Sequence, residues 1–331
     1  MTLLPKPENL CEVAMTGTHH VEVKNRDAVF KFDLYRNITI VRGDSGTGKT
    51  TLYEMIADYT RLKEASGVNI SCDKPCVALT DIDWKNQLRN INDSIVFIDE
   101  GAEFLKTRDF AGAIKDSDNY YVIFSRESLH DLPYSVEEIY EIKASGKYHS
   151  FKKMFKHNAK HVYYKEKAPT KLKYDTLLTE DSKSGYQFYQ HYFENSDIIC
   201  FTSESNAAIF SWLKEHEEQK IFVVADGAAF GSEIDRIMKM RSFPNIRLCL
   251  PESFEWLILK SGIINAVDMT RVDDPGDYID SAEYFSWENF FERYLIDITV
   301  NTPFQYAKRA INPVYLGEVN AEKIIKEIYT E

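Results

Sequence analysis

The feature that most constrains this chain is a glycine-rich segment between a run with the hydrophobic pattern of a strand and a run with that of a helix. A β-branched run at residues 38–41 precedes it, and apolar side chains at helical spacing follow it over residues 50–62. A strand that passes through a glycine turn into a helix is a unit of an α/β fold with a mainly parallel sheet. The segment reads GDSGTGKTT and consists of Gly43, Asp44, Ser45, Gly46, Thr47, Gly48, Lys49, Thr50 and Thr51.

The spacing of this segment, G-x4-G-K-T, suits a bound phosphate group. Glycines let backbone N–H groups point at an anion, and the following helix places its positive dipole end there. Lys49 is expected to reach the β- and γ-phosphates of a nucleotide, and the Thr50 hydroxyl to ligate Mg²⁺. The segment predicts ATP or GTP with Mg²⁺ as the bound ligand, and ATP is the expected one of the two because no N-K-x-D motif for guanine occurs.

Two acids follow a continuous apolar strand at residues 94–98. Asp99 is the expected holder of Mg²⁺, and Glu100 the expected base that polarises the attacking water. A second apolar strand at residues 120–124 ends in Ser125 and Arg126, either of which is a candidate sensor of the γ-phosphate. A salt-bridging role for Arg126 is the equal alternative.

These residues resemble a known group of proteins. The alternating runs at residues 21–23 and 29–32, the segment ITIVRGDSGTGKTTL and the later VFIDE are similar to the P-loop ATPases with an additional catalytic glutamate, which include ABC, AAA and RecA-like proteins. The hairpin before the loop most resembles the ABC and SMC side. No LSGGQ-type signature occurs, so the resemblance does not extend to a head-to-tail dimer of the ABC kind.

The second half alternates strands and helices with different chemistry. Strands are expected at residues 176–179, 198–202, 220–225 and 246–250, each followed by a helical pattern, which predicts βαβ units. Carboxylates follow three of these strands: Glu180, Asp226 and Glu255. The carboxyl ends of parallel strands meet in one crevice, where such side chains can converge on Mg²⁺.

This order of acids resembles the TOPRIM domain, and the two-part layout resembles the overcoming-lysogenisation-defect (OLD) family. The resemblance rests on LLTEDSKSG, FVVADGAAF and LPESFEWLIL, and Ala228 stands where the family has a second acid. It implies Mg²⁺ at Glu180, Asp226 and Glu255, nuclease chemistry, and a role in phage defence or mobile elements. A TOPRIM-like fold without nuclease activity, and a generic α/β domain whose acids cap helices, are the alternatives.

Four segments are expected. They are a P-loop NTPase domain at residues 1–145, a lysine-rich connector at 146–173, a TOPRIM-like α/β domain at 174–262 and a mostly helical extension at 263–331. The net charge is −12, yet residues 143–173 hold ten lysines and one acid. This stretch is either a solvated connector or a patch that contacts the phosphate backbone of DNA or RNA.

Further composition narrows the class of protein. No signal-peptide pattern or apolar run of membrane-spanning length occurs, and five scattered cysteines suit a reducing compartment, so a cytoplasmic protein is expected. A nucleotide switch that binds a partner protein, without nuclease activity, is the alternative function, and a homo-oligomer is compatible with it. A small-molecule kinase is disfavoured because no arginine-rich lid follows the Asp99 strand.

Overall fold

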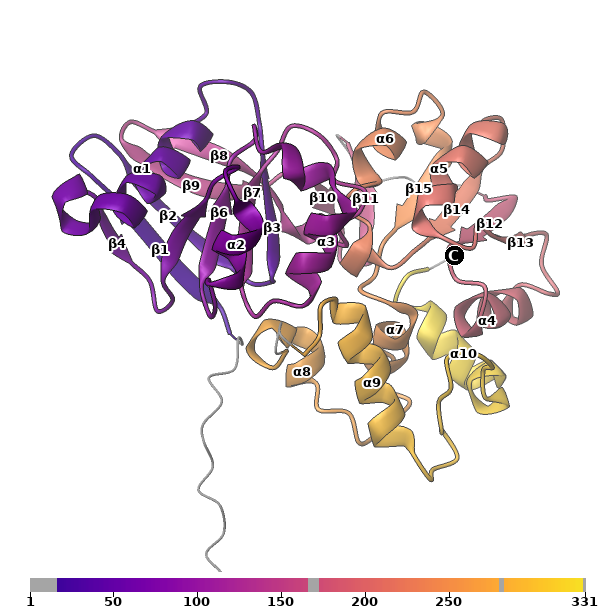
Figure 1. Cartoon of the computed structure of the whole chain (residues 1–331). Helices are drawn as coiled ribbons and strands as arrows, with labels where there is room; N and C mark the ends of the chain where they lie inside the picture. The colour runs from indigo at the N-terminus through magenta and orange to yellow at the C-terminus, as the bar shows by residue number, and fades with distance from the viewer. Residues whose placement is uncertain (1–16, 166–172, 280–282, 330–331) are drawn as a thin grey trace, which may run out of the picture.

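The computed structural model describes residues 17–165, 173–279 and 283–329, and it is an α/β protein with two mostly parallel sheets. Figure 1 shows two α/β units side by side, with the C-terminal helices packed beside the second unit. Residues 1–16 of the expected first domain and 166–172 of the expected connector lie outside the described residues. Within the described residues, no helix is long and apolar enough to cross a membrane.

The first sheet has the strand order β4-β1-β2-β9-β8-β3-β7-β6-β5. β3, β5, β6, β7 and β8 run parallel, whereas the β1–β2 and β8–β9 pairs are antiparallel. β3, β6 and β7 are buried along their whole length, as their apolar sequences predict. The strands are β1 (His19–Lys24), β2 (Val29–Leu34), β3 (Ile38–Arg42), β4 (Asn69–Ser71), β5 (Cys76–Leu79), β6 (Ile95–Ile98), β7 (Tyr120–Phe124), β8 (Ile139–Ser145) and β9 (Tyr148–Lys153).

Helices cover both faces of the first sheet's parallel part. α1 (Lys49–Leu62) packs Leu52 and Ile56 on one face, together with alternate residues of β3, β6 and β7. The opposite face packs against α2 (Trp84–Arg89) and α3 (Arg108–Lys115). Side chains of a strand point alternately to the two faces, so a strand covered on both must be apolar throughout.

The second sheet has the strand order β10-β11-β15-β14-β12-β13. β12 to β15 pair in parallel, and β11 pairs antiparallel with β15. The predicted alternation of strands and helices is confirmed. The elements are β10 (Lys156–His157), β11 (Val162–Tyr164), β12 (Thr176–Thr179), α4 (Ser184–Tyr192), β13 (Ile199–Thr202), α5 (Asn206–Glu215), β14 (Ile221–Val224), α6 (Ile234–Met238), β15 (Ile246–Cys249) and α7 (Phe254–Lys260).

One hydrophobic core joins the two units. Ile40 of β3 and Phe110 of α3 belong to the same buried cluster as Leu178 of β12 and Ile237 of α6. The other face of the second sheet packs on α4, α7 and the C-terminal helices α8 (Thr270–Asp273), α9 (Trp287–Thr299) and α10 (Glu318–Ile325). The predicted helical character after residue 263 is therefore confirmed in the described part of the chain.

The lysine-rich stretch does not form the separate connector predicted at residues 146–173. β9 lies inside the first sheet, parallel to β2, and the first unit therefore extends past residue 145. β10 and β11 then continue the second sheet beyond β15. Solvent-facing lysines hid the strand pattern, because a strand that is exposed on one face or lies at a sheet edge tolerates charged side chains.

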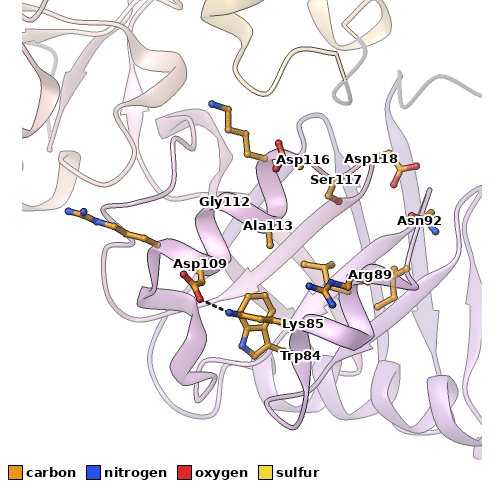
Figure 2. A pocket seen from close by; sticks show the side chains of 14 residues that line it. Trp84, Lys85, Arg89, Asn92, Asp109, Gly112, Ala113, Asp116, Ser117 and Asp118 are labelled. Atoms are coloured by element: carbon orange, nitrogen blue, oxygen red, sulfur yellow. Dashed lines mark hydrogen bonds and ion pairs between the residues drawn. The ribbon is translucent and has the colours of Figure 1, made fainter.

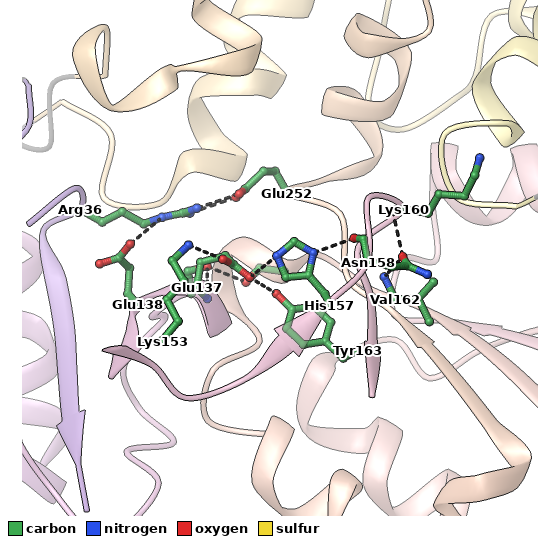
Figure 3. Close-up of polar contacts among 12 residues, drawn as sticks. Arg36, Glu137, Glu138, Lys153, His157, Asn158, Lys160, Val162, Tyr163 and Glu252 are labelled. Atoms are coloured by element: carbon green, nitrogen blue, oxygen red, sulfur yellow. Dashed lines mark hydrogen bonds and ion pairs between the residues drawn. The ribbon is translucent and has the colours of Figure 1, made fainter. Parts of the chain in front are cut away.

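Buried charges also cross between the units. The Arg36 guanidinium, just before β3, donates to both carboxylate oxygens of Glu252, which follows β15, at 2.9 and 2.7 Å. Figure 3 shows Arg36 between Glu252 and Glu138, whose Oε1 lies 3.7 Å from the arginine Nε. The arginine also stacks on the Trp287 ring, with its Cζ 3.5 Å from the ring centroid. This network fastens the start of β3 to both the second sheet and the helical extension.

Candidate functional site

The glycine-rich loop connects the carboxyl end of β3 to the first residue of α1. Gly48 caps α1 with φ of 102°, in the left-handed region that favours glycine. A Cβ at this position would lie 3.3 Å from the His149 ring and 3.4 Å from the Phe30 ring. The residue is glycine for two reasons, the backbone angle and the lack of space.

Lys49 is buried, with 4% of its surface exposed. Its ammonium donates to the backbone carbonyls of Gly43 and Asp44, the latter at 2.9 Å, and lies 3.8 Å from Glu100 Oε2. The loop therefore curls around the lysine head group. Thr50, the next residue of the helix, is exposed to solvent.

Glu100 and Arg126 meet next to the loop. Arg126 donates to Glu100 Oε1 at 2.8 Å and to Glu100 Oε2 at 3.2 Å. The same guanidinium donates to the Ser45 hydroxyl at 3.0 Å. Because β7 lies between β3 and β6 and all three are parallel, Arg126, Ser45 and Glu100 emerge at one edge of the sheet. The structure thus gives Arg126 the salt bridge that the sequence left as one of two options.

Asp99 directly follows β6 on the side of α1. Burial raises the pKa of Tyr53, a residue of α1, and the nearby Asp99 carboxylate raises it further. The Tyr53 hydroxyl donates to the Leu79 carbonyl at 3.1 Å, which ties α1 to the end of β5. Glu100 therefore lies beside Lys49, and Asp99 lies near Tyr53 of the same helix.

Glu180 and Asp226 come together at the carboxyl ends of β12 and β14. The Asp226 N–H donates to Glu180 Oε1 at 3.0 Å, while Glu180 Oε2 is buried without a partner among the described residues. Burial raises the pKa of Glu180 to about 8. Burial, and then the Glu180 carboxylate, raise the pKa of Asp226 well above its usual range. Two neighbouring carboxyl groups that are partly removed from solvent favour the protonated form of at least one.

Glu255 instead binds to the C-terminal segment. It is fully buried in the first turn of α7, accepts from the Tyr306 hydroxyl at 2.6 Å and lies 3.0 Å from the Lys308 ammonium. Lys308 also lies 3.2 Å from Glu288. Burial opposes the charge on Lys308, but the Glu255, Asp226 and Glu288 carboxylates together raise its pKa. Tyr306 and Lys308 were not predicted, because nothing in their local sequence marks contacts about fifty residues away.

Lys308 places a positive charge beside the carboxylates of the second unit. In the parts of the chain that the structure describes, no group of three or more His, Cys, Asp or Glu side chains is arranged to hold a metal ion. The Lys308 ammonium supplies positive charge at Glu255, one of the three acids that the sequence proposed as metal ligands. Lys308 is thus a cation that the described residues place beside these carboxylates.

The segment that carries Arg126 also contacts the turn that follows Asp226. The Ser135 hydroxyl donates to the Gly227 carbonyl at 3.2 Å, and the Gly231 N–H donates to the Tyr134 carbonyl at 2.9 Å. The buried Arg42, which immediately precedes the glycine loop, forms an ion pair with Asp235 of α6. Backbone and charged contacts therefore join segments that adjoin the two candidate sites.

A cavity of about 1150 Å³ lies between α2 and α3 (Figure 2). Its walls include Trp84, Arg89 and Lys115, and a Lys85–Asp109 ion pair bridges the two helices across it. The Trp84 ring stacks on Phe104, so its apolar face is already covered. None of the sequence-predicted site residues lines this cavity.

The chain was compared with protein-family models, with curated proteins and with solved structures. No family model, no curated protein and no solved structure matches it.

Proposed function

We propose that this protein binds ATP with Mg²⁺ at residues 43–51 and hydrolyses it, and that the nucleotide state is coupled to a second unit that binds or processes nucleic acid. The observation that carries the proposal is the convergence of Lys49, Glu100 and Arg126 on a glycine loop at a helix N-terminus. The resemblance to P-loop ATPases with an additional catalytic glutamate supports it.

The loop residues fit a nucleotide. Backbone N–H groups at the start of α1 favour phosphate, and the Lys49 ammonium would exchange its loop carbonyls for phosphate oxygens. Thr50 and Asp99 are the residues that would hold Mg²⁺, which neutralises phosphate charge when bound. Glu100 would accept a proton from the attacking water. In the present state Arg126 occupies both oxygens of Glu100 and restrains it.

Two variants test the hydrolytic site. Lys49→Ala should abolish binding of a fluorescent ATP analogue, because the positive charge at the β- and γ-phosphates is lost. Glu100→Gln should retain binding but stall phosphate release. Lys115→Ala and Glu54→Gln change exposed residues of α3 and α1 and serve as matched controls. Hydrolysis by Glu100→Gln at the wild-type rate would show that another group is the base.

The second unit is proposed to be TOPRIM-like, in a layout that resembles the OLD family, with a role in phage defence or mobile elements. Its supporting feature is the contact between Glu180 and Asp226 at the carboxyl ends of adjacent parallel strands. The metal role of these residues and of Glu255 stays a prediction. Mg²⁺-dependent nicking of DNA or RNA that disappears in Glu180→Ala and Asp226→Ala is the expected result.

A nucleotide-dependent switch that binds a partner protein is the second candidate. Two observations favour it: Ala228 replaces the second acid of the family pattern, and Lys308 already contacts the Glu255 carboxylate. In this case the ATP-loaded wild type, used as bait in a pull-down, should recover a partner protein. ATP-loaded Asp226→Ala should recover it equally well. Loss of nicking activity in the same variant would decide for the nuclease instead.

A further inference from the structure

Three adjoining cavities form a groove that leads away from the candidate hydrolytic site. The first, of about 310 Å³, is lined by Glu100 and Arg126. The second, of about 510 Å³, shares Arg126 and Lys106 with the first. The third, of about 330 Å³, shares Asp235 and Lys239 with the second and reaches the β10–β11 hairpin. The shared lining residues place the three cavities side by side, from Glu100 to the β10–β11 hairpin.

The acids of this groove are already paired. Glu127 lies 2.6 Å from Lys106, Asp131 lies 4.0 Å from Arg108, and Asp235 pairs with the buried Arg42. Glu100 is held by Arg126, as described above.

Three exposed lysines of the groove, Lys156, Lys165 and Lys239, have no acidic partner among the described residues. The groove therefore presents unpaired positive charge on a chain whose net charge is −12. An anionic ligand is the chemistry that complements it.

Aromatic rings accompany these charges. Phe155 and Tyr164 line the third cavity with Lys156 and Lys165, and both rings are only partly buried. Alternating cations and aromatic faces are the means by which proteins follow a flexible phosphate backbone and stack its bases. A rigid double helix cannot enter a chain of cavities of this size, whereas a single strand can.

We propose that this groove binds single-stranded nucleic acid and that its occupancy releases Glu100. Arg126 stands at the junction of the first two cavities and holds Glu100 and Ser45. A phosphate in the groove gives the guanidinium an alternative anion, because arginine binds phosphate in the same bidentate way as carboxylate. The freed Glu100 can then act on water. This second part rests on the proposed ATP hydrolysis.

Binding is measured first, without nucleotide, from the fluorescence anisotropy of labelled oligothymidylate over a salt series. The triple variant Lys156→Gln/Lys165→Gln/Lys239→Gln should weaken binding and reduce the slope of log K against log salt by about 2, at roughly 0.7 per phosphate contact. Lys323→Gln, an exposed lysine of α10, is the matched control and should leave the slope unchanged. Thermal unfolding checks that all variants are folded.

The proposal would be overturned if the folded wild type did not bind the oligonucleotide, or if Lys323→Gln weakened binding as much as the triple variant. It would also be overturned if a duplex bound with the same affinity as the single strand. Competition by polyglutamate as strong as by the oligonucleotide would overturn it too, and would indicate an acidic protein segment as the ligand. Coupling is measured as stimulation of phosphate release by the oligonucleotide, which Arg126→Gln should lose. Oligonucleotide binding without any ATP hydrolysis would uphold the groove while refuting the proposed function and the coupling. Hydrolysis without oligonucleotide binding would refute the groove and the coupling, and would leave the proposed ATP hydrolysis in place.

Discussion

Replacing Arg36 with methionine should destabilise the protein by about 3–5 kcal/mol, the cost of breaking a buried ion pair. Arg36 has 7% and Glu252 9% of its surface exposed, and two hydrogen bonds of 2.9 and 2.7 Å join them. Without the guanidinium, the Glu252 carboxylate keeps its burial and loses its partner. Burial already raises the pKa of Glu138 to about 7 against the opposing effect of Arg36, so this acid also loses a stabilising charge.

The size of the effect is measured by urea unfolding of the wild type, Arg36→Met, Glu252→Gln and the double variant. Because one hydrophobic core spans both units, a single cooperative transition is expected. The double variant should lose less unfolding free energy than the two single variants lose together. The difference, which is the coupling energy of the pair, should be about 2–3 kcal/mol.

Arg293→Met provides the control, since Arg293 pairs with Asp297 in solvent at 3.1 Å and exposed pairs contribute about 0–1 kcal/mol. If Arg36→Met costs no more than Arg293→Met, the buried network does not hold the units together.

Two further predictions concern the candidate sites. Because the pKa of Glu180 is raised from 4.5 to about 8, the folded state binds more protons than the unfolded state between these pH values, and wild-type stability should fall as pH rises from 5 to 8. Glu180→Gln should reduce that fall by a few kcal/mol, at about 1.4 kcal/mol per pKa unit; an unchanged fall in urea unfolding at the two pH values would contradict it. Gly48→Ala should cost about 1–3 kcal/mol through backbone strain and contact with His149, and should weaken ATP-analogue binding. Gly112→Ala in α3, where a Cβ meets nothing within 4 Å, should instead stabilise the protein by about 0.5–1 kcal/mol; equal effects of the two glycine variants on melting would refute this account.

The local elements followed from the sequence because their signals are local. The apolar runs of β3, β6 and β7 predict strands buried on both faces, and the glycines between β3 and α1 predict the turn. The positions of Lys49 and Glu100 also followed, since parallel strands bring their carboxyl ends to one edge of a sheet. The alternation in the second half predicted β12 to β15 in the same way.

Only the tertiary structure decided how distant charges pair. The lysine-rich stretch had the composition of a connector, yet β9 enters the first sheet and β10 and β11 join the second. Glu255 was expected with Glu180 and Asp226 as a metal ligand, and only the structure shows that it also accepts from Tyr306 and pairs with Lys308, while its charge still acts on Asp226. Charged side chains carry little information about their partners, because an ion pair depends on distance in space and not on sequence spacing.

The glycine loop and its lysine were therefore determined by the sequence alone, because the backbone conformation they need is set within nine residues. The pairing of Arg126 was not, because the sequence left this residue as either a γ-phosphate sensor or a salt-bridge partner. It depends on the position of β7 between β3 and β6. It also depends on the hydrophobic core in which the loop after β7 packs against α6 of the second unit. Packing of residues far apart in the chain, and no local pattern, places that guanidinium between Glu100, Ser45 and the groove.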